Sequence, residues 1–552
     1  MKLLKIDYLF LLFIFAISSL FVLELFLFPG RPATFDANTH ITTLAQFSQA
    51  IKSGDFPIVW LNNFANYGLP VGIFTHQLTN YVGGTITLLT QNPVLTYNIL
   101  VFIAIFLSGV FLYLFLRLYF KPLSSFLGVF IFTFTQYRIF DIYVRGAMPE
   151  VFSGIFLPLI LISLYSLIVK RKTYAFFLIS LFIAGLTLNH PMMLVVYSIL
   201  FIPYLFFLLF TNNLSKMLRT KLLIITASSM LLGLLISSYY VLPLNLELKY
   251  FYNGLGGNHL IQSSYLSLSS FFITRWNYFL RGDIIQFGLL ETLILISGFL
   301  YYFYKKLIQK SKENLKFLEL ILFLSVLIIF FTTPFSNFLY EKVFFLNSLQ
   351  FPSRFLSSLI ILPPILIAYF YDKFPKKIFL LLIVILVCIF SFPQIYGKDF
   401  TAYPLSSYYF SKENAYSVMM NTIWTGKTED YPDKNPQGEI ISGKGKIINE
   451  TLKNSSRRYT VDASTSLTMV DHTFYFPGWN VYVDGVKTNI EYQNPKYRGV
   501  ITYQVSQGKH FVYLVFQDTK VRLLGKILSV AALILLFGLF FFRNKISKLI
   551  KL

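Results

Sequence analysis

The sequence predicts an all-α polytopic membrane bundle of about twelve transmembrane helices, with a C-terminal extracytoplasmic β-sandwich domain before the last helix. The first observation is composition, since 55% of the 552 residues are hydrophobic and only 13% are charged. A soluble domain carries about 25% charged residues, so this chain cannot cover a globular surface in water. The second observation is a series of apolar runs near the roughly 20 residues that cross a bilayer core. The third is a polar segment near the C-terminus with strand-like alternation.

Twelve apolar runs are the predicted spans. They are 6–28, 93–117, 122–137, 150–169, 174–188, 193–210, 221–243, 286–304, 316–333, 355–371, 377–393 and 522–542. The first run is expected to be a retained helix, because Leu27-Phe28-Pro29-Gly30 lacks the small-residue site at which signal peptides are cleaved.

The basic residues between the runs support this count and set the orientation. With a cytoplasmic N-terminus, 22 Lys and Arg fall in the inside loops and the tail, against 9 in the short outside segments. The positive-inside rule expects this alternation. We therefore predict a multi-pass protein of the cytoplasmic (plasma) membrane with both termini cytoplasmic, and the net charge of +22 does not indicate nucleic acid.

Three regions follow from this pattern. Residues 1–393 form the transmembrane domain, whose first outer loop is 29–92; residues 394–521 form a β-rich extracytoplasmic domain; and residues 522–552 are the last helix with a basic tail. Within the first outer loop, Asn38–Ser53 has helical spacing and is predicted to lie on the membrane surface.

The second half of the polar segment predicts strands that alternate with turns. The turns are Pro477-Gly478, Asp484-Gly485 and Gln507-Gly508. Trp479 stands beside a turn but within apolar alternation, so we expect it in the core rather than on a sugar-binding surface. The strands are predicted at Arg458–Ala463, Thr473–Phe476, Asn480–Val483, Val500–Val505 and His510–Phe516.

Asp36 and His40 follow the first span and are the first candidates for chemistry. Asp36 or Asn38 fits a helix N-cap, whose side chain satisfies free backbone N–H groups. A carboxylate at the level of the lipid headgroups also fits a general base that deprotonates an acceptor hydroxyl. The residues alone leave both interpretations open.

A second group of charges lies at the outer ends of two spans, where Arg138, Asp141, Arg145 and Glu150 fall within thirteen residues. An Arg–Glu pair can simply fasten a loop. Alternatively, guanidinium groups match phosphate oxygens in a fixed fork. The excess of arginine in outside segments favours the anion site: Arg31, Arg138, Arg145, Arg275, Arg281 and Arg354.

Arg354 begins a span and either reaches a lipid headgroup or anchors the helix by snorkelling. His190 lies in a tight turn between two spans, and His76 is similar. Such histidines more often form hydrogen bonds than bind ligands. No metal-ligand spacing, phosphate-binding glycine loop or nucleophile elbow is present in the sequence.

Several stretches then match a known pattern in its expected order along nearly the whole chain. They are Phe35-Asp36, Gly54-Asp55-Phe56-Pro57, Asn66-Tyr67-Gly68-Leu69-Pro70, Arg145-Gly146-Ala147-Met148-Pro149-Glu150, Leu188-Asn189-His190, Gln350-Phe351-Pro352-Ser353-Arg354-Phe355, the segment 475–485 and Gly508-Lys509-His510. The chain resembles the bacterial YfhO-like proteins, also described as "6-pyruvoyl-tetrahydropterin synthase-related" membrane proteins, in the GT-C-type membrane glycosyltransferase superfamily. The pterin label is only a domain name, because no residue here supports pterin chemistry.

This resemblance implies a GT-C-like transmembrane fold and transfer of a sugar from a polyprenyl-phosphate carrier to an extracytoplasmic glycan, lipid or protein. GT-C enzymes carry an acidic residue in the first outer loop, which here is Asp36, with His40 near it. Many relatives have a second acidic residue or histidine beside it, whereas here Asn38 and His40 are near and Asp55 lies beyond the predicted helix.

On the same resemblance, Arg145 and Arg354 would hold the phosphate, and Arg138, Glu150 and His190 would line the substrate site. The implied partners are membrane lipid, a polyprenyl-phosphate sugar and the acceptor, with no cofactor or divalent metal indicated. Two alternatives remain: a transporter or flippase of lipid-linked glycans, and a non-catalytic membrane assembly protein. A flippase would need ionisable residues at mid-membrane depth, and the spans contain few.

Overall fold

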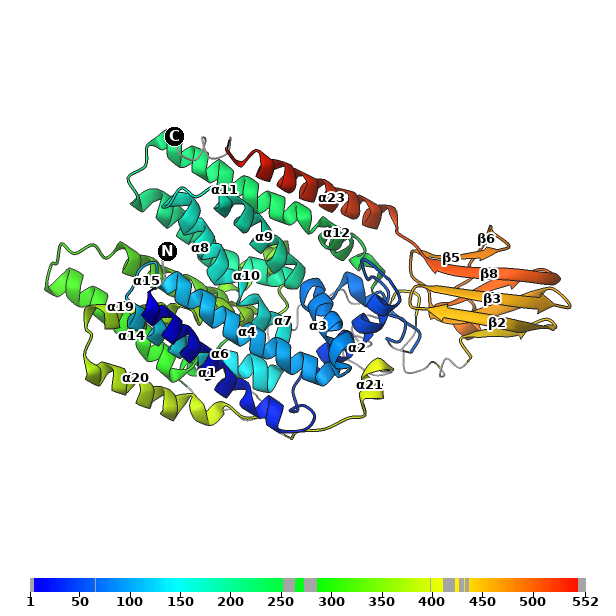
Figure 1. Cartoon of the computed structure of the whole chain (residues 1–552), viewed down its shortest axis with the longest axis horizontal. Helices are drawn as coiled ribbons and strands as arrows, with labels where there is room; N and C mark the ends of the chain where they lie inside the picture. Colours follow the sequence, from blue (N-terminus) through cyan, green and yellow to red (C-terminus); the bar gives the residue numbers. More distant parts are fainter. Residues whose placement is uncertain are drawn as a thin grey trace.

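The computed structural model places the helices in one elongated bundle and the strands in a smaller body at one end of it (Figure 1). It describes residues 4–64, 66–251, 264–272, 285–397, 399–410, 422–425, 431 and 436–544. Arg275 and Arg281 of the expected outer arginines lie outside the described residues.

The described residues contain eight helices that are long and apolar enough to cross a membrane, or up to 10 if each of two bent pairs counts as one span. The helical membrane bundle is therefore confirmed, and the count of about twelve stays a prediction. Shorter helices, α9 (Tyr174–Asn189) and α14 (Leu289–Phe303), occupy the two other expected ranges. The eight are α1 (Lys5–Leu27), α4 (Pro93–Leu116), Met148–Ile168 with α7 (Met148–Ser153) and α8 (Phe156–Ile168), α10 (Pro191–Thr211), α11 (Lys216–Ile236), Pro352–Lys373 with α19 (Leu362–Lys373), Lys377–Gln394 with α20 (Lys377–Phe390), and α23 (Lys520–Phe541).

Polar residues and proline begin several of these helices. At the start of α4 the Asn92 side chain accepts hydrogen bonds from the backbone N–H groups of Val94 and Leu95, both at 3.0 Å, and Pro93 occupies the first helical position. Proline fits there because that position needs no backbone donor. Thr519 caps α23 in the same way, by accepting from the N–H of Arg522.

The segment after α5 (Pro122–Thr133) differs from the expectation. Residues 138–149 were expected to form an outside loop, but α6 (Gln136–Ile139) and the π-helix η2 (Phe140–Arg145) continue the helix after a bend of 47°. The apolar residues between the charges continue the helical pattern, and the charged side chains pair with one another inside the protein. The charged residues therefore do not indicate the end of the helix in this segment.

The first outer segment contains two helices. The expected helix is present as α2 (Ala37–Lys52), whereas α3 (Gln77–Thr90) was not predicted. Most side chains of α2 are buried against neighbouring segments of the protein, and its expected place on the membrane surface stays a prediction. Its polar residues tolerate burial by bonding to the backbone, as Thr43 does to the carbonyl of Thr39 at 2.7 Å.

The C-terminal β domain is a sandwich of two antiparallel sheets, as expected. One sheet has the order β1-β4-β7, and the other has the order β2-β3-β8-β5-β6. The Asp484-Gly485 turn joins β5 to β6 with positive φ angles of 49° and 83°. The strands are β1 (Gly438–Ser442), β2 (Gly445–Lys453), β3 (Ser456–Ala463), β4 (Leu467–Phe474), β5 (Trp479–Val483), β6 (Val486–Thr488), β7 (Val500–Val505) and β8 (Gly508–Phe516).

Strands β1, β2 and β6 were not predicted, and Thr473–Phe476 forms only the end of β4 and the residues after it. The β2 sequence Gly445–Lys453 explains one omission. It is mostly exposed and contains Lys, Asn and Glu, so it lacks the apolar alternation of a half-buried strand.

The β domain is fastened to the bundle at several places. The Trp60 and Trp479 rings meet edge to face at 5.2 Å, and Trp479 is only 3% exposed, which confirms its expected place in a core. The Asp55 carboxylate accepts hydrogen bonds from Ser455 at 2.7 Å and Asn454 at 2.6 Å. These contacts join the first outer segment directly to the sheets.

A buried ion pair fixes the last helix. Arg522 of α23 lies 2.9 Å from the Glu247 carboxylate, which follows α12 (Ser238–Leu246), and it also donates to the carbonyl of Pro477 at 2.8 Å. One side chain therefore joins the bundle, the β domain and the last span.

Candidate functional site

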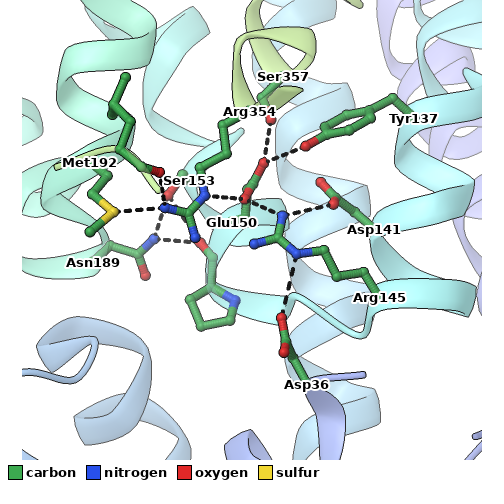
Figure 2. Close-up of polar contacts among 12 residues, drawn as sticks. Asp36, Tyr137, Asp141, Arg145, Glu150, Ser153, Asn189, Met192, Arg354 and Ser357 are labelled. Atoms are coloured by element: carbon green, nitrogen blue, oxygen red, sulfur yellow. Dashed lines mark hydrogen bonds and ion pairs between the residues drawn. The ribbon is translucent and has the colours of Figure 1, made fainter. Parts of the chain in front are cut away.

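The charged residues of segment 136–150 meet the start of α2 at the end of the bundle that faces the β domain. Figure 2 shows Arg145 between three carboxylates. Its Nη1 lies 2.7 Å from Glu150 Oε2 and 3.4 Å from Asp141 Oδ1, and its Nε lies 3.4 Å from Asp36 Oδ2. A single guanidinium thus connects the first outer segment to the bent helix.

The backbone around Gly146 brings these residues together. The Asp36 N–H donates to the Arg145 carbonyl at 2.7 Å, and the Phe35 N–H donates to the Val144 carbonyl at 3.2 Å. Gly146 ends the π-helix with φ of 73°, and a Cβ there would lie 2.7 Å from the Thr34 hydroxyl oxygen. Glycine is needed both for this conformation and for this close approach.

Glu150 is the most heavily bonded residue of the cluster. Its Oε1 accepts hydrogen bonds from Ser357 at 2.7 Å and Tyr137 at 3.0 Å, and its Oε2 faces Arg145 and the Nε of Arg354, the latter at 3.5 Å. Its side chain is almost fully buried. A buried carboxylate needs this number of partners to offset the loss of water.

Arg354 and Arg138 have different neighbours, because Arg354 lies among the charged residues and Arg138 points away from them. Arg354 donates from Nη1 to the Leu349 carbonyl at 2.7 Å and contacts the Met192 sulfur (Figure 2). Arg138 turns away from the other charges, donates to Ser108 at 2.9 Å and lies over the Phe132 ring at 4.1 Å.

A cavity of about 20 Å³ separates Arg138 from the acidic residues of the cluster, and Asp141, Glu150 and Ser357 line it with Arg138. That volume is sufficient for one water molecule, which would connect the arginine with the carboxylates.

The charges of this cluster balance. Arg138, Arg145 and Arg354 supply three guanidinium groups, and Asp36, Asp141 and Glu150 supply three carboxylates. The expectation that Arg145 and Arg354 bind phosphate stays a prediction, but in this geometry both already face carboxylates.

Asp36 occupies the N-cap position of α2 without acting as a cap. Its side chain accepts no hydrogen bond from the helix backbone and pairs instead with Arg145. It is also the accessible carboxylate of the cluster, with 39% of its side chain exposed against 5% for Asp141 and 1% for Glu150. Asp36 can therefore meet a substrate while the other two cannot.

Three histidines from separate segments lie in a row beside this cluster. The ring centroids of His40 and His76 are 5.8 Å apart, and those of His76 and His190 are 4.5 Å apart. His76 Nδ1 lies 3.0 Å from the Asn189 carbonyl. Because a carbonyl only accepts, the proton is on Nδ1 and Nε2 of His76 is an acceptor.

Burial keeps the histidines outside the spans neutral. It lowers the pKa of His40 to about 3, and the positive charge of Arg145 adds to this effect. Burial likewise lowers the pKa of His76 to about 3, helped by His40 and Arg354. Within the described part of the chain, no three histidine, cysteine or acidic side chains are arranged to hold a metal ion.

The structure thus joins four of the expected residues by direct contacts: Asp36, Arg145, Glu150 and Arg354. His40 and His190 lie beside them in the histidine row with His76, and Arg138 lies across the water-sized cavity. Tyr137 and Ser357, which bond to Glu150, were not proposed as site residues. Ser357 had a usable signal, because it follows Arg354 by three residues at a helix start, where such residues share a face.

Comparison with known proteins assigns a family. A family model described as "6-pyruvoyl-tetrahydropterin synthase related domain; membrane protein" matches residues 76–397, which is more than half of the chain. The chain belongs to this family. The match confirms the expected pterin-synthase-related, YfhO-like membrane family and the membrane location.

Other comparisons add little to this family assignment. No curated protein matches the chain. Among solved structures, this family member is similar to an oligosaccharyltransferase of Archaeoglobus fulgidus, crystallised in complex with Zn and sulfate, at 14% identity and a TM-score of 0.36. The similarity covers 70% of this chain and 53% of that one, so the chain matches about half the length of the archaeal protein.

Proposed function

We propose that this family member is a membrane glycosyltransferase of the cytoplasmic membrane, with both termini in the cytoplasm. It transfers a sugar from a polyprenyl-phosphate carrier to an extracytoplasmic glycan, lipid or protein. The observation that carries the proposal is the Asp36 carboxylate, which is 39% exposed, held by Arg145 and not used as a helix cap.

The position of Asp36 suits the chemistry of transfer. It follows the end of α1 by a short segment, so it lies near the bilayer boundary where a polyprenyl phosphate presents its sugar. The bond between the anomeric carbon and the phosphate oxygen breaks as the anomeric carbon bonds to the acceptor oxygen. The hydroxyl proton passes to Asp36, and the polyprenyl phosphate leaves.

The neighbouring residues are proposed to position this base. Arg145 contacts Asp36 at 3.4 Å and is itself fixed by Glu150 at 2.7 Å. Glu150 in turn is fixed by Ser357 and faces Arg354. His40 lies one turn after Asp36 in α2 and is almost fully buried, so it is proposed to help position Asp36 as a neutral group.

The β domain is proposed to cover the site or hold the acceptor. Its contacts with the first outer segment, through Trp60 and Asp55, support this role. The segment that carries Asp36 also contains both of these residues, so movement of the β domain would act on the loop that carries the base.

The direct test is transfer by the purified full-length protein in proteoliposomes. Polyprenyl-phosphate sugars with a radiolabelled sugar would be supplied, and release of water-soluble or acceptor-linked label would be measured. We expect time-dependent transfer that requires the protein. Movement of intact labelled lipid between leaflets without cleavage would instead support a flippase, and neither movement nor transfer with any sugar would favour an assembly protein.

A further inference from the structure

Arg31 is a buried cation without a matching anion. It follows α1, and only 9% of it is exposed. Its Nη1 makes one long hydrogen bond of 3.4 Å to the Pro32 carbonyl, and its Nε has no hydrogen-bond partner. No described carboxylate forms an ion pair with it. Burying an isolated charge costs several kcal/mol or more, so such a group normally has a partner.

The other buried arginines of the described chain have acidic neighbours. Arg354 faces Glu150, Arg522 pairs with Glu247, and Arg457 lies 3.9 Å from Asp471. Arg138 shares its water-sized cavity with Asp141 and Glu150. Arg31 is therefore the buried arginine of the described chain whose charge is left uncompensated.

The surroundings of Arg31 are held in place and contain further unused polar atoms. Arg31 pairs with Thr401 through both backbone groups, at 3.2 Å and 2.9 Å, so the segment before α21 (Leu405–Tyr409) is fixed against it. The Tyr403 ring lies 5.5 Å from the guanidinium. The Tyr408 hydroxyl is buried and makes no hydrogen bond of good geometry.

Tyr408 lies near Arg31, because the Tyr403 ring is 5.5 Å from the guanidinium and 6.5 Å from the Tyr408 ring. Burial raises the pKa of the Tyr408 phenol, and the positive charge of Arg31 and a side-chain hydrogen bond with it oppose that rise. The guanidinium and the hydroxyl are thus neighbours with donors to spare, since the hydroxyl can donate one hydrogen bond and the Nε another. Two such donors are suited to an anion that has several oxygen atoms.

The segments that carry Arg31 and Tyr408 also carry exposed apolar side chains. Leu27, Phe28 and Phe35 near Arg31 in the chain, and Tyr403 and Leu405 near Tyr408, are between 41% and 66% exposed. Because α1 is a membrane-spanning helix, these side chains face the region between lipid headgroups and acyl chains. A ligand here would combine an anionic head with an apolar tail.

We propose that Arg31, together with the Tyr408 hydroxyl, binds the phosphate of a membrane lipid. The phosphate of the polyprenyl carrier and that of a bulk phospholipid have the same oxygen chemistry, so both are possible sources. In so far as it assigns the donor phosphate a place on the same outer segment as Asp36, the inference rests on the proposed function. It also removes a difficulty, because the balanced charges around Arg145 leave no excess positive charge there for a phosphate.

The test is a binding measurement that needs no sugar transfer. Full-length protein in nanodiscs of zwitterionic phosphatidylcholine would be titrated with undecaprenyl phosphate, with undecaprenol, which lacks the phosphate, and with phosphatidylglycerol. We expect undecaprenyl phosphate to bind and undecaprenol not to bind. Arg31→Gln should weaken binding about tenfold or more, as expected for the loss of a charged hydrogen bond, and Tyr408→Phe should weaken it less.

Arg219→Gln is the matched control, because Arg219 is a half-buried arginine at the start of α11 that donates to a backbone carbonyl at 3.1 Å. It should bind like wild type. Competition by phosphatidylglycerol at equal concentration would identify a general phospholipid site, and its failure to compete would identify the carrier. Unchanged binding by a folded Arg31→Gln protein, or equal binding of undecaprenol, would overturn the proposal even if the protein transfers sugar.

Discussion

The Nε atom of Arg145 lies 3.4 Å from the carboxylate of Asp36, and this contact joins the first outer segment to the charged end of the bent helix. The same guanidinium lies 2.7 Å from Glu150. Asp36 is thereby fixed from the side of the bundle while part of its side chain remains exposed.

Arg145→Gln should destabilise the protein by about 3–5 kcal/mol, the usual cost of removing one partner of a buried ion pair. Glu150 and Asp141 would then face each other without the charge that separates them. Arg145→Lys keeps the charge but lacks the planar fork that reaches Asp36 and Glu150 together. We expect it to fold and to lose sugar transfer. Thermal unfolding in detergent and the proteoliposome assay measure the two effects.

Arg219→Gln again provides the comparison, since it changes an arginine outside the cluster. An Arg145→Gln protein that unfolds at the wild-type temperature would show that the cluster contributes little to stability. An Arg145→Lys protein with normal transfer would separate Arg145 from the positioning of Asp36.

The sequence predicts the parts of this fold that depend on composition and period. Apolar runs locate the spans, and the turns at Pro477-Gly478 and Asp484-Gly485 locate strands of the β domain. Charge misleads at residues 138–149, because the charged side chains pair inside the protein instead of meeting water. Strand β2 is missed because an exposed strand has no apolar alternation.

The site was predictable only in outline. Charge and resemblance indicate Asp36, Arg145, Glu150 and Arg354, and the structure joins them in a chain of contacts. Their pairing depends on tertiary contacts such as the hydrogen bonds between 35–36 and 144–145, which sequence spacing does not encode. The row formed by His40, His76 and His190 comes from three segments that are distant in the sequence, so no local sequence pattern predicts it.

The histidine row predicts sensitivity to acid. His40 and His76 have pKa values lowered to about 3 in the folded protein, against about 6.5 when unfolded. As the pH falls, these histidines take up protons in the unfolded chain before they do so in the folded protein. The stability that the two neutral histidines contribute is therefore complete above pH 6.5 and is lost as the pH falls toward 3. Each of the two histidines should lower the free energy of unfolding by up to about 1.4 kcal/mol for each pH unit within that window.

His40→Gln and His76→Gln should flatten this dependence, because glutamine does not titrate. The unfolding temperature of the purified proteins between pH 7 and pH 4 gives the comparison. His510→Gln in the β domain should act in the opposite direction, because the hydrogen bond to Asp484 raises the pKa of His510. Identical pH profiles for wild type and both row variants would contradict burial of neutral imidazoles.

Trp479→Ala should destabilise the β domain by about 3–5 kcal/mol, as is usual for a buried large aromatic side chain. The indole packs against Trp60 at 5.2 Å and Phe516 at 5.4 Å, and the Arg457 guanidinium lies over it at 4.9 Å. Limited proteolysis of the β domain should become faster. Tyr482→Ala on the same strand is a comparison at a partly exposed position. A Trp479→Ala protein as protease-resistant as wild type, which lost only glycan binding, would place the indole in a binding role.

The proposed orientation can be tested with single cysteines after Cys388→Ser. Asn347→Cys and Ser456→Cys should react with a membrane-impermeant thiol reagent in intact cells, because both are expected outside. Thr173→Cys and Lys312→Cys should react only after the cells are opened. Labelling of either of the last two positions in intact cells would break the predicted alternation of spans.

Asp36→Asn separates the two interpretations of this residue. Asparagine is nearly isosteric and caps a helix about as well as aspartate, and the Asp36 side chain makes no cap hydrogen bond in any case. The protein should therefore insert and fold normally. A base that accepts the acceptor's proton is typically worth about 10²–10⁴ in rate, so transfer should fall by at least about a hundredfold. Asp518→Asn, which removes a carboxylate paired with Lys526 on the surface, should keep full activity. Full transfer by Asp36→Asn would move the base elsewhere. His40 would then be the next candidate, because the Asp55 carboxylate is already bonded to Asn454 and Ser455 of the β domain.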